Sequence, residues 1–61
     1  MWIFTKGYGS FNIDNFDKIL VDDGCTFLIR WGKPSCMIAR SDVEDIVRDA
    51  IRRGDNYVEV E

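Results

Sequence analysis

The sequence predicts an α+β fold in which an antiparallel meander sheet of four or five strands packs against one amphipathic helix. Three observations lead to this prediction. Short apolar stretches separated by turn residues fill residues 1–40, as expected for a series of hairpins. Apolar residues then recur with the helical period over Ser41–Arg53. Residues 57–61 alternate between polar and apolar side chains, which predicts a short C-terminal strand.

The predicted helix carries its apolar side chains at the i, i+3, i+4, i+7, i+8 spacing of one stripe: Val43, Ile46, Val47, Ala50 and Ile51. Ser41 and Glu44 match a capping box at its start, and Gly54 stands where a left-handed residue commonly ends a helix. We expect Ile46 and Val47, in the middle of the stripe, to be fully buried. A single helix cannot bury its own stripe, so the strands must form the opposing layer.

Two short strands are expected near the N-terminus, at residues 1–5 and 11–13. The segment between them, Lys6–Ser10, is rich in glycine and indicates a hairpin turn. Residues 14–17 predict a further turn, because Asp and Asn side chains form hydrogen bonds with their own backbone.

Three more strands are expected, joined by tight turns, at residues 17–22, 25–31 and 34–40. We expect a three-residue loop at Asp22–Gly24, with its glycine left-handed at a bulge, and a two-residue turn at Gly32–Lys33. These turns would place Phe27 between Ile19 and Ile38 on the neighbouring strands.

The expected register makes one sheet face almost purely apolar, and this face should receive the helix. Its members are Ile19, Val21, Cys25, Phe27, Ile29, Trp31, Cys36 and Ile38. A two-residue turn at Asp23-Gly24 is the alternative, and it would place Leu20 beside Phe27. We prefer the bulged loop, because a slip by one residue mixes the apolar set with the opposite face.

The two cysteines, Cys25 and Cys36, share this face in the expected register without lying opposite each other. About four residues along a strand separate them, which is roughly 13 Å. A disulfide needs Cα atoms within about 7 Å. We therefore expect two free thiols, buried as small apolar side chains in a reducing cytoplasm.

The chain has 61 residues, with 11 acidic side chains against 8 basic ones, and we expect residues 1–61 to form a single domain. The acidic balance disfavours a dedicated nucleic-acid binder, which normally carries a basic surface. The absence of histidine removes the commonest general base and metal ligand. We expect no catalytic residue, no metal and no cofactor. No apolar run is long enough to cross a membrane and no leader is visible, so a cytoplasmic protein is expected.

Some apolar side chains exceed what one short helix can cover, and they form a possible interaction surface: Trp2, Phe4, Leu20, Leu28 and Met37. Two explanations stay open. Either the N-terminal strand folds over the open sheet face, or that face binds a partner. A domain of this size buries only about 60% of its unfolded surface and is marginal alone, which favours the second explanation.

Four segments carry a resemblance to known proteins: Met1-Trp2-Ile3, the run Asn12–Ile19, the turn at Gly24 and the helix start Ser41–Glu44. Together they look like a class of very short bacterial and phage-borne proteins. The layout of residues 1–52 is also similar to the small flagellar-operon proteins of the FlbD type. The chain departs from that pattern at residues 22–24 and in its extra strand at residues 57–61. The resemblance implies a small α+β domain from a bacterium or its mobile elements, and it carries over no catalytic residue.

The function that the sequence favours is a non-catalytic interaction or self-association module. Its expected partner is a second copy, in a homodimer at micromolar concentration, or another protein. The alternative is a small regulatory protein that binds nucleic acid, and an enzyme is the third choice. A basic patch on the folded surface would favour the regulator, whereas an apolar patch would favour the module.

Overall fold

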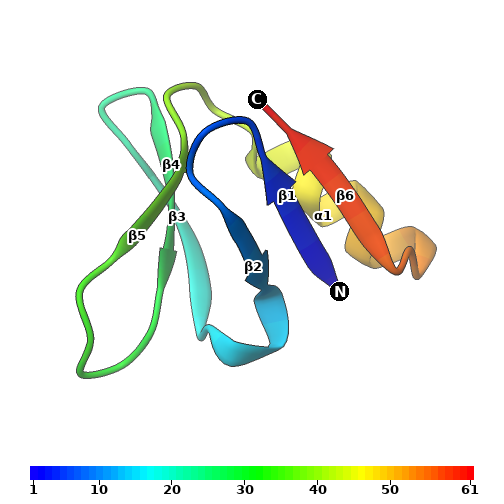
Figure 1. The fold of residues 1–61 in the computed structure, drawn as a ribbon, viewed down its shortest axis with the longest axis horizontal. Coiled ribbons are helices and arrows are strands. Elements are labelled where there is room, and N and C mark those ends of the chain that lie inside the picture. Colours follow the sequence, from blue (N-terminus) through cyan, green and yellow to red (C-terminus); the bar gives the residue numbers. More distant parts are fainter.

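The computed structural model describes all 61 residues and shows an α+β fold of two three-stranded sheets and one helix (Figure 1). The elements follow one another as β1 (Trp2–Thr5), β2 (Ser10–Asn12), a 3₁₀ turn (Ile13–Asn15), β3 (Lys18–Asp22), β4 (Cys25–Ile29), β5 (Cys36–Ala39), α1 (Glu44–Arg53) and β6 (Tyr57–Val60). The α+β class is confirmed. The single meander of four or five strands is wrong, because β1 pairs with β2 and β6 in a separate sheet, and neither β1 nor β2 pairs with β3.

The first sheet has the strand order β2-β1-β6, with β1 antiparallel to β2 and parallel to β6. Ile3 lies opposite Phe11 on one side and Val58 on the other. Ile3, Val58 and Val60 point into the core, as the alternation of the C-terminal strand predicted for the two valines. Figure 1 shows α1 behind β1 and β6, so the helix covers the inner side of this sheet.

The second sheet has the order β3-β4-β5, and its first hairpin differs in register from the one expected. Asp23 and Gly24 have φ values of 53° and 74°, as both central residues of a two-residue type I′ turn require. The left-handed Gly24 is confirmed, but the three-residue bulged loop is wrong. The twist of a type I′ turn matches that of the strands, and aspartate tolerates the left-handed region better than most residues do.

The corrected register reverses the two faces of β4. Leu20 lies opposite Phe27, and Ile19 lies opposite Leu28. Thr26 and Leu28 are fully buried against the rest of the molecule. Phe27 therefore points away from the helix, and the expected Phe27–Ile38 contact surface for α1 is wrong.

The connection between β4 and β5 is longer than the expected two-residue turn at Gly32–Lys33. It runs from residue 30 to residue 35, and Lys33 N donates to the Arg30 carbonyl at 3.1 Å. Gly32 has a φ of 74° at the third position, as in a type II turn. Pro34 has no N–H group for a sheet ladder, so β5 starts only at Cys36.

A bulge in β5 decides which of its residues reach the core. Thr26 pairs with Ala39 and Phe27 pairs with Met37, which leaves Ile38 as the extra residue. Ile38 and Ala39 are consequently both fully buried, while Met37 stays on the outer side with Phe27.

The two cysteines lie on opposite faces of the second sheet, which corrects the expectation that they share one. Cys36 is level with Leu28 and packs at the edge of the core. Cys25 follows the outward alternation of Phe27 and is partly exposed. Both thiols are free.

The helix begins at Glu44 rather than at Ser41, and the expected capping box is not formed. Thr26 on β4 sets the start instead: its hydroxyl donates to the Ser41 carbonyl at 2.7 Å and accepts from Val43 N at 3.0 Å. The Asp42 carboxylate accepts from Glu44 N at 3.1 Å. The helix ends at a left-handed Gly54, as the sequence predicts.

The buried helix stripe is narrower than the sequence indicates. Val43, Val47 and Ala50 are buried within an arc of about 60° at 3.6 residues per turn. Ile46 and Ile51 lie on the two sides of that arc and are 49% and 50% exposed. The expectation that Ile46 is fully buried is therefore wrong, because each three-stranded sheet leaves the flanks of the helix open to solvent.

Candidate interaction surfaces

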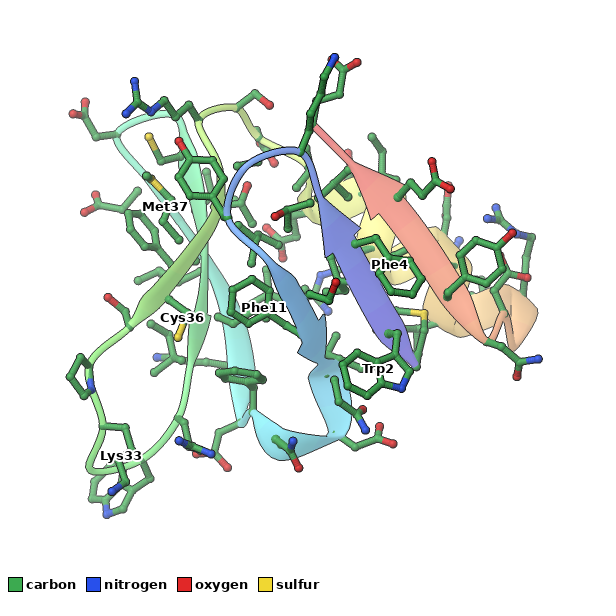
Figure 2. The ribbon with its side chains drawn as sticks, viewed as in Figure 1. Trp2, Phe4, Phe11, Lys33, Cys36 and Met37 are labelled. Atoms are coloured by element: carbon green, nitrogen blue, oxygen red, sulfur yellow. The ribbon has the colours of Figure 1, made fainter.

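The structure divides the five residues of the expected interaction surface among three places. Trp2 and Phe4 lie on the outer side of β1, and Leu20 and Met37 lie on the outer side of the second sheet. Leu28 is fully buried, so its assignment to a contact surface is wrong. Figure 2 shows Met37 on β5, well separated from Trp2 and Phe4 on β1.

The outer face of the second sheet is a continuous apolar surface, which we call the meander face. It consists of Leu20, Cys25, Phe27, Ile29 and Met37. At its centre Leu20, Phe27 and Met37 lie directly opposite one another on three adjacent strands. Directly opposed side chains in a sheet are about 4.5–5.5 Å apart at Cβ, so these three form one contiguous row.

The meander face is open because the rest of the molecule packs on the other side of the sheet. The core side holds the fully buried Thr26, Leu28 and Ile38. On the outer side Leu20 is 42% exposed, and Phe27 is partly exposed. The N-terminal strand does not fold over this face, because it pairs with β2 and β6.

Two exposed charges border the row on β3. Lys18 comes two residues before Leu20 and Asp22 comes two residues after it, so all three point to the same side of the strand. The four ion pairs of the structure involve other residues, and neither Lys18 nor Asp22 has a charged partner within the chain.

The loop between β4 and β5 carries an exposed tryptophan, Trp31. Trp31 N donates to the Asp17 carboxylate at 2.6 Å, which fixes the backbone at the base of the loop. The Arg30 guanidinium lies 5.7 Å from the centre of the Phe16 ring. The Trp31 side chain is 92% exposed. Tryptophan is enriched at the centres of protein interfaces. The expectation that Trp31 belongs to the sheet face covered by the helix is wrong.

The outer face of the first sheet carries a second group of exposed aromatic residues. Trp2, Phe4 and Tyr57 are 45%, 40% and 57% exposed. The Phe4 and Tyr57 rings contact each other with centroids 5.7 Å apart. The sequence analysis did not include Tyr57 in the candidate surface. The polar–apolar alternation of β6 places Tyr57 on its outer side, but only the pairing of β6 with β1 brings it opposite Trp2.

A shallow cleft of about 280 Å³ lies between the 3₁₀ turn, β3 and α1. It is lined by Ile13, Phe16, Asp17, Lys18, Ile19, Arg48 and Ile51. Asp17 is held by the Trp31 N–H group, and Arg48 Nε donates to the Glu44 carboxylate at 2.6 Å. No serine, threonine or cysteine nucleophile lines this cleft.

The basic side chains of the helix are paired with acids. Arg48 with Glu44, Arg52 with Asp49 and Arg53 with Asp55 form ion pairs of 2.6, 3.1 and 2.9 Å. Each arginine therefore has a carboxylate beside it, and α1 presents a mixed charged surface rather than a basic patch.

The structure places no group of three or more Cys, Asp and Glu side chains where they could hold a metal ion. The ten-residue α1 is neither long nor apolar enough to cross a membrane. No protein-family model, curated protein or solved structure matches the chain. The likeness in layout to the FlbD-type proteins therefore stays an expectation from the sequence.

Proposed function

We propose that the chain is a non-catalytic interaction module that associates with a second copy of itself through the meander face. The observation that carries this proposal is the row of Leu20, Phe27 and Met37, which is apolar and contiguous, with Leu20 42% exposed and the other two partly exposed. An exposed apolar patch is a common mark of a protein-binding surface.

The arrangement of polar residues favours the meander face over the aromatic face of the first sheet. In the meander face the polar residues Lys18 and Asp22 stand at the ends of β3, outside the apolar row. In the first sheet, polar residues interrupt the aromatic ones: Phe4 lies between Ser10 and Glu59. Stable interfaces usually have an apolar centre with a polar rim, which is the pattern of the meander face.

The small size of the domain favours self-association. Ten of 61 residues are buried, so the core of one copy is small and the stability of a single copy is expected to be marginal. A second copy would cover the meander face of both chains at once, since a twofold interface uses the same surface twice. Both cysteines are free, and this suits the reducing cytoplasm that we propose as its location.

A nucleic-acid-binding regulator is the less supported alternative. The chain has a net charge of −3, and Arg48, Arg52 and Arg53 are paired with carboxylates. Binding to phosphates would have to displace those pairs and overcome the repulsion between two acidic molecules.

The proposal is tested by the mass of the protein in solution over a dilution series. Sedimentation equilibrium of the parent chain should give twice the 7.1 kDa monomer mass at tens of micromolar. Leu20→Glu places a charge at the centre of the row and should give a monomer. Tyr57→Glu is the matched control, because Tyr57 is similarly exposed on the other sheet, and it should stay dimeric. A parent chain that remains monomeric at hundreds of micromolar would refute the proposal.

A further inference from the structure

The meander face is nearly symmetric about its central row. Lys18 and Asp22 each lie about 7 Å from Leu20 along β3, in opposite directions. On β4, Ile29 is level with Lys18 and Cys25 is level with Asp22. On β3 and β4 a line through the row therefore separates a positive charge, with Ile29 beside it, from a negative charge, with Cys25 beside it.

Two identical sheets can pack face to face about a twofold axis only if the axis lies in the plane between them. The axis can run along the strands or across them. Packed sheets lie about 10 Å apart and are usually rotated by about 30° relative to each other. In either arrangement, residues of the two copies therefore face each other only approximately.

An axis along the strands would lay β3 of one copy over β5 of the other. Asp22 would then approach Arg40, which follows β5 and whose Nε already donates to the Tyr8 hydroxyl at 2.6 Å. Lys18 would lie over the start of β5, where Pro34 and Ser35 offer no acidic side chain. This arrangement leaves Lys18 of each copy without a partner, whereas an axis across the strands leaves only Arg40, which keeps its hydrogen bond to the Tyr8 hydroxyl.

An axis across the strands, along the row itself, would lay β3 over β3 in the opposite direction. Lys18 would then meet Asp22 of the second copy, and Asp22 would meet Lys18 of the second copy. Leu20, Phe27 and Met37 would each face their own counterpart at the centre. We infer that two copies pair in this second way, through the meander face, about a twofold axis that follows the Leu20–Phe27–Met37 row.

This inference rests on the proposed self-association and adds the partner contacts that orient it. The apolar row supplies the buried centre, and the two symmetric Lys18–Asp22 pairs select one orientation at the rim. Charges of this kind contribute specificity more than affinity, because placing like charges opposite each other disfavours every other alignment.

Charge reversal provides the test, because an isologous interface makes a distinctive pattern of loss and rescue. Lys18→Asp alone would bring two carboxylates together at both contacts, and Asp22→Lys alone would bring two ammonium groups together at both. Each single variant should dimerise about tenfold more weakly than the parent at low salt, a size expected for two exposed pairs. Equimolar mixing of the two variants should restore dimerisation, since both contacts of the mixed dimer then join opposite charges.

The double variant Lys18→Asp with Asp22→Lys should dimerise as the parent does. Lys6→Asp and Glu59→Lys are the controls for net charge, because both residues are exposed and lie away from the meander face. Circular dichroism of every variant checks that the fold is kept. The loss in the single variants should shrink as salt is raised, because exposed charges are screened.

The outcomes separate this inference from the proposed function. A dimeric parent whose single variants dimerise unchanged would overturn the inferred orientation and leave self-association standing. Weakening by Asp22→Lys alone, without rescue on mixing, would indicate the axis along the strands and would also overturn it. A monomeric parent would refute the proposed function and the inference together.

Discussion

The two faces of the β3–β4–β5 sheet are both apolar, but they have different neighbours. Leu28 and Ile38 on the inner face are fully buried by the first sheet and α1. On the outer face Leu20 is 42% exposed and Phe27 is partly exposed, and their directly opposed neighbours are one another and Met37. Residues of the same chemical type on adjacent strands thus have opposite roles, and the turn between the strands decides which face is which.

This comparison shows how an apolar surface becomes available for a partner. A strand buried on one side should alternate between apolar and polar residues. β4 carries apolar residues on both sides, with Thr26 as the exception on the buried side. The alternation is therefore absent where we propose that a second molecule takes the place of solvent.

The largest expected effect is the difference in unfolding free energy between alanine substitutions of Leu28 on the inner face and Leu20 on the outer face. Leu28→Ala should lower the free energy of unfolding by about 2–5 kcal/mol, through lost burial and a cavity. Leu20→Ala, measured at a concentration where the protein is monomeric, should lower it by about 1 kcal/mol or less, because Leu20 is already 42% exposed. Urea unfolding measures both. Equal losses for the two variants would contradict the assignment of the faces.

Removal of the buried Thr26 hydroxyl should have the next largest effect on the free energy of unfolding. Thr26→Val keeps the shape of the side chain but leaves the Val43 N–H group without its acceptor at the helix start. The expected loss is about 1–3 kcal/mol, the usual cost of a buried unpaired donor. Amide hydrogen exchange at Val43 should also become faster. Thr26→Ser keeps the hydroxyl and is the control, and protection of the Val43 amide that is equal in both variants would argue against this cap.

Substitution of Gly24, in the turn that sets the register, should have the smallest effect on the free energy of unfolding. Gly24 has a φ of 74°, and a Cβ added there would meet no atom within 4 Å, so a substitution is disfavoured only by backbone strain. Gly24→Ala should cost about 1–2 kcal/mol in unfolding free energy. Gly24→Asn should cost less, because asparagine tolerates the left-handed region. Urea unfolding of the two variants measures the difference, and an alanine variant as stable as the parent would show that this residue does not hold the type I′ turn.

Much of the local structure follows from neighbouring residues and could be predicted. The helix is defined by the spacing of Val43, Val47 and Ala50, and its end by Gly54. The left-handed Gly24 and the alternation of β6 are equally local. Each of these features depends on residues within a few positions of one another, so each can be predicted from local sequence.

The candidate surface was only partly predictable, for reasons of register. Leu20 and Met37 belong to it, but Leu28 does not. Phe27 belongs to it as well, although the expected register, which differs by one residue, placed Phe27 on the inner face. Composition near Asp22-Asp23-Gly24 allows both turns, and the choice depends on what packs on each side of the sheet.

The remaining features were decided by the tertiary structure. The parallel pairing of β1 with β6 joins Trp2 to Tyr57 across nearly the whole chain, and no local pattern specifies such a partner. The start of α1 depends on Thr26, a residue on a distant strand, rather than on the capping box at Ser41. The exposure of Ile46 depends on the width of the sheets beside it. Short-range hydrogen bonding and side-chain periodicity are encoded in sequence, whereas strand partners and burial depend on the free energy of packing the whole chain.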